Sequence, residues 1–267
     1  MVVHLWNKLL LCCVFEATSD VVAEFCADNV RYLELRTTPR ANRCTNMTKS
    51  DYVEAVLVGI LAVAVICLSN LCVVDATLCC PEPDNLVVGL DLSGDPSYDA
   101  RKFIPVLRAV KAAGFKLTAH LAENAKNLEE IPALLTVGLD RIGHATFLDP
   151  AVGGSDQLVD AVRHSSTPIE ICLTSNVKCA TVKSYDNHHM KFWLSAGHPV
   201  VICTDDKGLF DTNLSDEYRL AANTFGLDRK TVFDLSLRSL DYLFCSEQQR
   251  SSVYGYWVSF MKEHFPV

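Results

Sequence analysis

Three apolar runs of this sequence end on side chains that can bind a metal ion or transfer a proton. The runs end in His120 with Glu123, in His144, and in Asp205 with Asp206. Imidazole and carboxylate groups are zinc ligands, and a carboxylate beside a metal can carry protons. Taken singly, such residues are more often hydrogen-bonded structural side chains or solvated turns. Their recurrence at three run ends has the composition of a metal-dependent hydrolase site.

These five residues can be given separate chemical roles. We expect His120 and Asp205 to bind one zinc ion, which would lower the pKa of its bound water to about 7. Positions three apart in a strand face opposite sides, so the chain must turn after His120 for Glu123 to reach the same site. Glu123 would then transfer protons, and His144 would orient the water or stabilise developing charge. Asp206 would accept a hydrogen bond from substrate or help take a proton.

Short apolar runs that alternate with amphipathic segments position these residues. Strands are expected within 30–36, 86–92, 116–123, 140–144, 169–176 and 199–206, with a seventh, less regular run at 71–75. Helices are expected at 18–28, from Thr48 onward, at 99–113, 128–137, 155–164 and 191–196, and throughout the tail from about 215. Polar residues at the ends of several parallel strands favour a closed (β/α)8 TIM-type barrel over an open sheet with one crevice. No glycine-rich nucleotide or phosphate motif occurs in the sequence.

Composition excludes several classes of protein. The net charge of -8 argues against nucleic-acid binding, which needs a basic face. The twelve cysteines include two adjacent pairs and no C-x-x-C spacing, so they do not form the pattern of a disulfide scaffold. We expect reduced cysteines in a cytoplasmic protein, with a thiol metal site as the alternative. The 267 residues are expected to form a single domain.

Two stretches resemble export or membrane segments. Residues 1–15 contain a very short apolar core, but no small-residue cleavage pattern follows it. Residues 55–74 carry no charged side chain and are long enough to span a bilayer. Gly59 and the polar pair at 69–70 favour a buried helix and strand instead. Membrane insertion through 55–74 is kept as an alternative.

Other candidate residues are less specific. Arg40 follows a predicted strand end, a place that suits phosphate binding, although a surface arginine is the commoner interpretation. His188, His189 and His198 lie in polar or proline-flanked loops and are expected to be structural. The H-E-x-x-H motif and the cytidine-deaminase zinc motif are both absent.

Several motifs together resemble the adenosine and AMP deaminase family of barrel metallohydrolases. Five of them occur in order, namely Gly89–Asp95, His120–Glu123, Arg141–His144, Leu173–Asn176 and Cys203–Asp206. Two more, Tyr32–Arg40 and Ser184–His189, are similar to the adenosine deaminase-like branch, the N6-methyl-AMP deaminases. The resemblance runs from about residue 18 to the end.

The resemblance implies a site and a reaction. It implies zinc ligation by His120 and Asp205, proton donation to the purine by Glu123, and assistance to the metal-bound water by His144. It also implies substrate contacts from Gly94, Asp206 and Asp75, with Thr37, Thr38, Pro39 and Arg40 near a nucleotide phosphate. Hydroxide would add at purine C6 and expel ammonia from adenosine, giving inosine, or methylamine from N6-methyl-AMP, giving IMP. The partner would be a small purine nucleoside or nucleotide, with no nucleic acid or membrane, and the protein a monomer.

Two departures from the family pattern qualify the expected activity. The family's first strand carries a His-x-His pair that supplies two further zinc ligands, and no such pair occurs here. Residues 1–17 and the cysteine-rich stretch 61–80 are also atypical, so we expect an N-terminally truncated barrel with an irregular third strand. The alternative function is a catalytically inactive barrel fragment or splice product.

Overall fold

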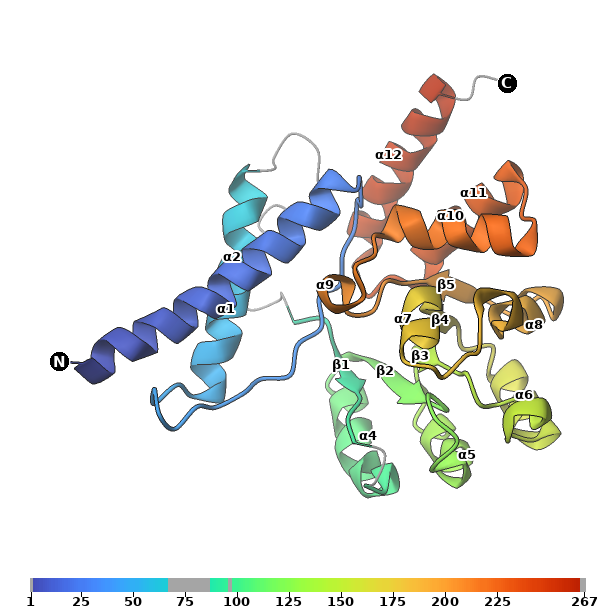
Figure 1. Ribbon diagram of the computed structural model, residues 1–267, viewed down its shortest axis with the longest axis horizontal. Coiled ribbons are helices and arrows are strands. Elements are labelled where there is room, and N and C mark those ends of the chain that lie inside the picture. Colours follow the sequence, from blue (N-terminus) through green and yellow to red (C-terminus); the bar gives the residue numbers. More distant parts are fainter. Residues whose placement is uncertain (1, 67–86, 96–97, 265–267) are drawn as a thin grey trace. The chain divides into compact units, whose positions relative to one another are not determined.

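Five parallel strands lie side by side in chain order in the computed structural model (Figure 1). They are β1 (Gly89–Leu92), β2 (Lys116–Leu121), β3 (Arg141–His144), β4 (Ile169–Ile171) and β5 (Val200–Ile202). In the register between β2 and β3, His120 is opposite Gly143 and Leu121 is opposite His144. The predicted strands at 116–123 and 140–144 are confirmed, and those at 86–92, 169–176 and 199–206 are present but shorter.

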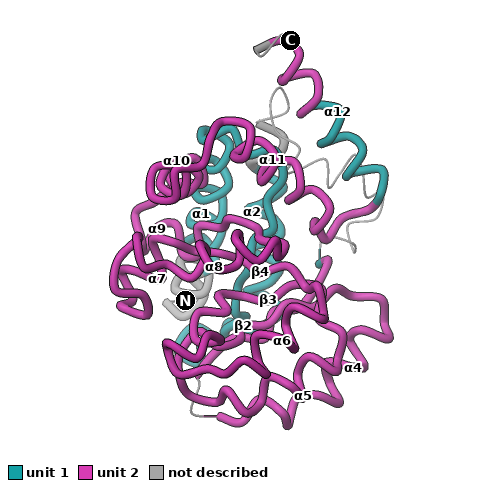
Figure 2. The backbone as a smooth tube through the Cα atoms, turned by 90° about the vertical axis from the view of Figure 1, so that its right-hand side faces the viewer, with its two compact units in different colours: residues 1–87, 247–256 teal, residues 88–246, 257–267 magenta. Residues whose placement is uncertain are grey.

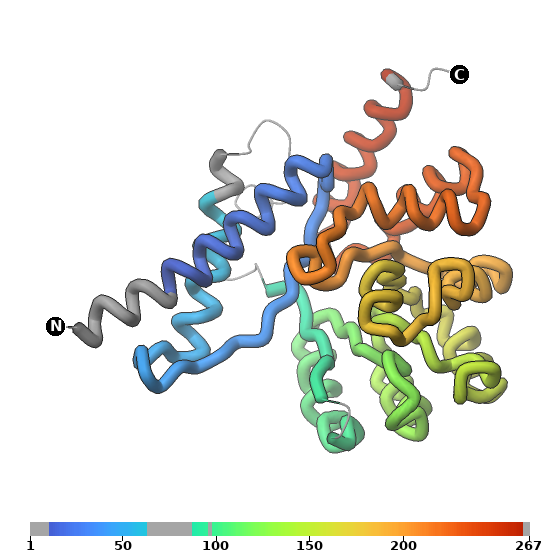
Figure 3. The backbone as a smooth tube through the Cα atoms, in the orientation of Figure 1, coloured from blue at the N-terminus to red at the C-terminus, as the bar shows by residue number. Residues whose placement is uncertain are grey.

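The structure describes residues 2–66, 87–95 and 98–264. They fall into two compact units, one of residues 1–87 with 247–256 and one of residues 88–246 with 257–267 (Figure 2). The course of the chain through both can be followed in Figure 3. All five strands belong to the second unit.

Helices follow each strand of the second unit. In chain order they are α4 (Ile104–Ala112), α5 (Ile131–Leu135), α6 (Asp156–Ser165), α7 (Leu173–Lys178), α8 (Met190–Ser195), α9 (Lys207–Phe210), α10 (Leu214–Phe225) and α11 (Arg229–Ser239). The last helix, α12 (Glu247–His264), is divided between the two units after residue 256. Short 3-10 turns at Ala100–Phe103, Leu128–Glu130, Pro150–Val152, Tyr185–Asn187 and Leu240–Tyr242 join them. This repeated strand-then-helix order is the topology of a (β/α) barrel.

The core of the second unit lies between the strands and the helices that cover them. Leu117, Ile142 and Ile169, from three neighbouring strands, are fully buried and pack with Met190 and Trp193 of α8. Burying one such side chain stabilises a fold by about 1.5–3 kcal/mol. Polar residues lie among the apolar ones along four of these strands, for example Asp91 on β1 and Glu170 on β4. This packing fixes the strand ends, where the candidate site residues lie.

The first unit contains two long helices, α1 (Val2–Ala27) and α2 (Lys49–Ile66). Thr48 and Asp51 cap α2 reciprocally, since the Asp51 N–H donates to Thr48 Oγ1 and the Thr48 N–H donates to Asp51 Oδ2. The predicted start of α1 at Thr18 is wrong. Thr18 lies inside the helix and its hydroxyl donates to the Val14 carbonyl, a bond that lets threonine sit within a helix.

The strand predicted at 30–36 is absent from the structure. Residues 32–41 have no regular secondary structure, and no described segment forms a ladder with them. Alternation of apolar and polar residues signals a half-buried extended segment, but a strand also needs a hydrogen-bonded neighbour. The expected run at 71–75 lies outside the described residues.

Within the part of the chain that the structure describes, no helix combines the length and apolar character needed to cross a membrane. Residues 55–66 of the uncharged run 55–74 form the C-terminal part of α2, and the rest of the run lies outside the described residues.

Candidate active site

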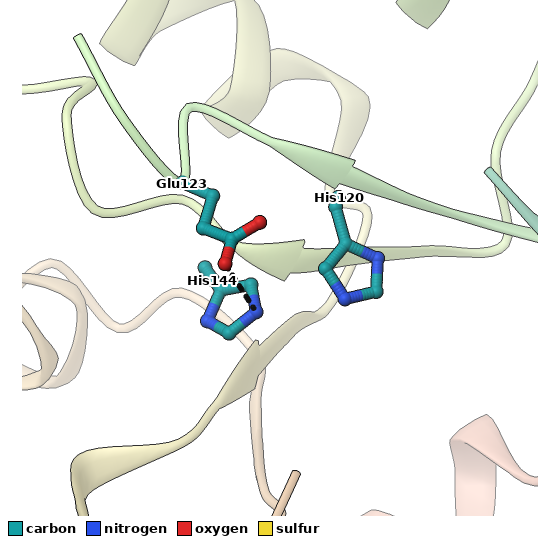
Figure 4. Close-up of side chains that lie close together, drawn as sticks. All are labelled: His120, Glu123 and His144. Atoms are coloured by element: carbon teal, nitrogen blue, oxygen red, sulfur yellow. Dashed lines mark ion pairs between the residues drawn. The ribbon is translucent and has the colours of Figure 1, made fainter. Parts of the chain in front are cut away.

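The turn expected after His120 is present. Strand β2 ends at Leu121, and Ala122 adopts a left-handed backbone conformation with φ of 50°. This turn brings the Glu123 carboxylate to the same side as the His120 ring, facing His144 (Figure 4). Glu123 Oε1 lies 3.8 Å from His144 Nε2, and the centroids of the His120 and His144 rings are 5.0 Å apart. Three of the predicted site residues therefore come together.

His120 is oriented by a carboxylate that the sequence analysis did not single out. Its Nδ1 lies 3.1 Å from Oδ1 of Asp91, which comes from the neighbouring strand β1. A histidine that binds a metal commonly donates its other ring N–H to a carboxylate, which fixes the ring and its tautomer. The sequence does contain a signal for this role, because Asp91 is a charged residue inside the apolar run 86–92.

His144 is buried at the end of β3, and its backbone is strained. Its side chain is 2 % exposed, and both His144 and Ala145 have positive φ, at 62° and 54°. Such conformations persist only where surrounding contacts hold them, often at functional sites. Here His189 Nε2 donates to the His144 carbonyl at 2.7 Å. Burial, together with the nearby His120, lowers the pKa of His144, so its neutral form is favoured.

Asp205 lies three residues after the end of β5 and also has a left-handed backbone, with φ of 57°. Its Oδ2 accepts a hydrogen bond of 2.7 Å from the Ser175 hydroxyl and lies 3.9 Å from His144 Nε2. Asp206 follows it, and partial burial together with the charge of Asp205 raises the pKa of Asp206. His144 is thus close to Glu123, Asp205 and the His120 ring, and Asp206 follows Asp205 in the chain.

The donor atoms at this site suit zinc in type. Ligand atoms of His120, Glu123 and His144 lie within 4.8 Å of one another, as do those of His144, Cys172 and Asp205. Zinc takes nitrogen, oxygen and thiolate ligands. A hydrogen bond with Cys203 and burial raise the pKa of the Cys172 thiol well above its usual value. The imidazole of His120 and the carboxylate of Asp205 are ligand types that zinc takes.

The remaining predicted substrate residues are more scattered. Gly94 has a φ of 137°, which favours glycine, and a side chain there would meet no atom within 4 Å. Thr37, Thr38 and Arg40 are exposed and Pro39 is half-buried, all in the first unit. The Thr37 hydroxyl shares a 2.8 Å hydrogen bond with the Tyr52 hydroxyl. Asp75 lies outside the described residues.

His188, which is buried, and His189, which is half-buried, make stability depend on pH. Burial lowers the pKa of His188 to about 2 and that of His189 to about 4. The unfolded chain binds protons below pH 6.5 that the folded chain does not, so the free energy of unfolding falls as pH drops below 6.5. Each histidine contributes at most about 1.4 kcal/mol per pH unit.

Urea unfolding between pH 7 and pH 5 tests this dependence. His188→Gln should make the decline shallower, because glutamine does not titrate. The matched change His164→Gln, at a solvent-exposed position, should leave the slope as it is. An unchanged slope in His188→Gln would contradict the prediction.

Known proteins resemble this chain along most of its length. The family model described as adenosine deaminase matches residues 11–255. A human protein named N6-methyl-AMP deaminase is 46 % identical over 263 residues, which cover 91 % of this chain and 74 % of the human protein. The crystal structure of Arabidopsis ADAL complexed with GMP superposes with a TM-score of 0.81 at 32 % identity, covering 94 % of this chain and 78 % of that one.

A more distant structure shares the fold alone. An amidohydrolase from Burkholderia ambifaria, solved with bound Zn, has a TM-score of 0.74 at 17 % identity and covers 94 % of this chain and 73 % of its own. Together with the parallel strand order, these likenesses confirm the expected α/β fold of metal-dependent hydrolase barrels.

Proposed function

This chain belongs to the adenosine deaminase family, and from that premise we propose that it deaminates N6-methyl-AMP to IMP and methylamine with the help of one zinc ion. The observation that carries the proposal is the meeting of Glu123 with His144 and Asp205 at three strand ends. A proton donor, a neutral imidazole and a metal-binding carboxylate are the groups that hydrolytic deamination requires.

The choice of a nucleotide substrate is supported by the relatives. The human relative is named N6-methyl-AMP deaminase, and Arabidopsis ADAL has been crystallised with GMP and with IMP. IMP is the product that loss of methylamine from N6-methyl-AMP would give. Arg40, which is exposed and carries a permanent positive charge, is our candidate for the phosphate, with Thr37, Thr38 and Pro39 beside it. Gly94, Asp75 and Asp206 are the further substrate contacts we propose.

The residues of the site divide the reaction between them. In the proposed reaction Glu123 holds a proton toward the purine ring nitrogen next to C6, so that the ring accepts electrons as the water oxygen bonds to C6. His144 orients that water, and Asp206 takes the proton that the water loses as its oxygen bonds to C6. The C6–N bond then breaks, and methylamine leaves with that proton from Asp206. The remaining hydroxyl proton returns to Glu123 as the C6 carbonyl of IMP forms. When bound by His120 and Asp205, zinc supplies a water whose pKa is lowered to about 7.

Zinc affinity is predicted to depend on Asp91. We expect Asp91→Asn to weaken zinc binding by about 10- to 100-fold, because the carboxylate that orients His120 loses its charge. Competition with a chromogenic chelator measures this affinity without any need for turnover. Asp156→Asn, an exposed position on α6, is the matched control and should bind zinc like the unmodified chain. Equal affinities for both variants would show that Asp91 does not support the metal ligand.

A second candidate function follows from the ligand count. Catalytic zinc sites use three protein ligands, whereas the His-x-His pair of the family does not occur in this sequence. A chain that cannot retain zinc would bind purine nucleotides without converting them. This candidate predicts binding of IMP or GMP with no turnover at any zinc concentration.

A substrate panel separates these possibilities. The full chain, supplied with zinc, is incubated with N6-methyl-AMP, AMP, N6-methyladenosine and adenosine, and products are separated by chromatography. We expect the highest kcat/KM for N6-methyl-AMP. Faster conversion of adenosine would reassign the substrate, and nucleotide binding without any conversion would favour the second candidate.

Location and assembly are also part of the proposal. We propose a cytoplasmic monomer whose 267 residues act as a single domain. The cysteines within the described residues are all free thiols, as a reducing compartment would keep them.

A further inference from the structure

We propose that His188 and Asn176 fix the tautomer of His144, so that this imidazole acts as a hydrogen-bond donor through Nε2–H. The inference deepens the proposed function and rests on it for its catalytic meaning. Its structural part stands alone, because a chain of four hydrogen-bonding groups has only one consistent arrangement of protons. His188, which the sequence analysis expected to be structural, becomes a positioning residue.

The hydrogen-bond chain begins at a backbone N–H, a group that can only donate. The N–H of Met190 can only donate, and it lies 3.1 Å from Nδ1 of His188. That nitrogen must therefore be an acceptor without a proton. In a neutral imidazole the single proton is then on Nε2. His188 is neutral across the physiological range, because burial lowers its pKa to about 2.

The direction of donation passes from His188 to Asn176. His188 Nε2–H lies 3.1 Å from Asn176 Oδ1, so this oxygen accepts. The amide is thereby oriented with its Nδ2 hydrogens away from His188. The Thr181 hydroxyl donates its hydrogen to the backbone carbonyl of Asn176 at 3.0 Å. The same Thr181 oxygen can therefore accept one of the two Asn176 Nδ2 hydrogens, at 3.1 Å.

The other Nδ2 hydrogen reaches His144. Asn176 Nδ2 lies 3.3 Å from His144 Nδ1 and 3.4 Å from Thr146 Oγ1. Since an amide NH2 group cannot accept, His144 Nδ1 is an acceptor and the proton of the neutral ring is on Nε2. Asn176 and His188 are each 1 % exposed, so burial makes any mispaired arrangement costly.

The donor that results points into the site. His144 Nε2 lies 3.8 Å from Glu123 Oε1 and 3.9 Å from Asp205 Oδ2. Both separations exceed direct hydrogen-bond length, so a water or substrate oxygen between them would receive the Nε2–H bond. A donor in this position holds the oxygen and stabilises negative charge on it. It does not remove a proton from that oxygen.

Nitrogen-15 NMR of the full chain, with labelled histidine, tests the assignment at neutral pH. Chemical shifts and two-bond proton couplings distinguish a protonated ring nitrogen from an unprotonated one, and His144→Gln identifies the signals by their loss. We expect His144 with a protonated Nε2 and an unprotonated Nδ1. The opposite tautomer in the unmodified chain would overturn the proposal, whatever the variants do.

Asn176→Asp reverses the direction of hydrogen-bond donation between residue 176 and His144, with little change in side-chain shape. Aspartate can only accept at both oxygens, so we expect a proton to appear on His144 Nδ1. Asn187→Asp, the same change at an exposed position on the same connection, should leave the His144 signals unchanged. An unprotonated Nδ1 in Asn176→Asp would overturn the proposal.

Turnover provides an independent readout. In a serine protease triad, the wrong histidine tautomer lowers kcat by about 10⁴-fold, and a fall of that order is expected for Asn176→Asp. If the NMR result is as expected but the unmodified chain has no activity, the proposed function fails and the tautomer assignment stands. If the chain is active but His144 has the opposite tautomer, the proposed function stands and the tautomer assignment fails.

Discussion

Glu123→Gln is expected to lower kcat/KM for N6-methyl-AMP by about 10²- to 10⁴-fold, the usual contribution of a general acid. Glutamine keeps the length of the side chain and its ability to hydrogen-bond, but it has no carboxyl proton to deliver to the purine. Its neighbours do not replace it, because His144 Nε2 lies 3.8 Å away and is favoured in the neutral form. Initial rates with saturating zinc measure the effect.

The same experiment distinguishes catalysis from metal binding. Zinc content should be similar in Glu123→Gln and in the unmodified chain, because His120 and Asp205 are the proposed ligands. Glu129→Gln, an exposed glutamate six residues along the chain, is the matched control and should retain full activity. Undiminished turnover in Glu123→Gln would remove Glu123 from the mechanism.

Glu170→Gln is expected to destabilise the fold by about 3–5 kcal/mol, because it removes the negative charge of a buried ion pair with arginine. Glu170 Oε1 accepts a 2.6 Å hydrogen bond from Arg141 Nε, with side chains 3 % and 7 % exposed. Arg141 also donates to the Tyr242 carbonyl at 2.7 Å and lies over the ring of Phe244. These contacts hold the guanidinium in place at the start of β3, the strand that ends at His144.

An exposed ion pair provides the control for this second prediction. Lys230 and Asp234 on α11 are 2.8 Å apart, with side chains 82 % and 43 % exposed. Asp234→Asn should cost less than about 1 kcal/mol, since solvent screens a surface pair. Urea unfolding at pH 7 measures both variants. Similar losses of stability in the two would contradict the account of the buried pair.

The sequence predicted the strand ends well because their pattern is local. The apolar run before His120, the need for a turn before Glu123, and the polar ends at His144 and Asp205 all follow from side-chain periodicity. The ends of β2 and β3 and the turn at Ala122 agree with them, whereas β5 ends at Ile202, three residues before Asp205. A buried parallel strand leaves a continuous apolar run in the sequence, so its existence is easy to detect.

Features that depend on partners were harder to predict. The segment 30–36 has the alternation of a strand, yet no described segment pairs with it. The run after Ile169 was extended to Asn176, whereas the strand ends at Ile171 and α7 begins at Leu173. Short apolar runs do not distinguish a strand from a buried helix by period alone.

The supporting residues of the site were missed for a related reason. Asp91 contacts His120 from a different strand, and His188 contacts Asn176 from a separate loop. Their functions come from tertiary contacts between segments that are far apart in the sequence. Spacing along the chain carries no signal of such contacts, although Asp91 does stand out as a charged residue inside the apolar run 86–92.

The most direct measurement of the central claim is the fate of solvent oxygen. The zinc-supplied chain is incubated with N6-methyl-AMP in water enriched in oxygen-18, and the products are weighed by mass spectrometry. Hydrolytic deamination predicts IMP that carries one solvent-derived oxygen at C6, together with an equal amount of methylamine. Recovery of unlabelled product, or of unchanged N6-methyl-AMP, would contradict it.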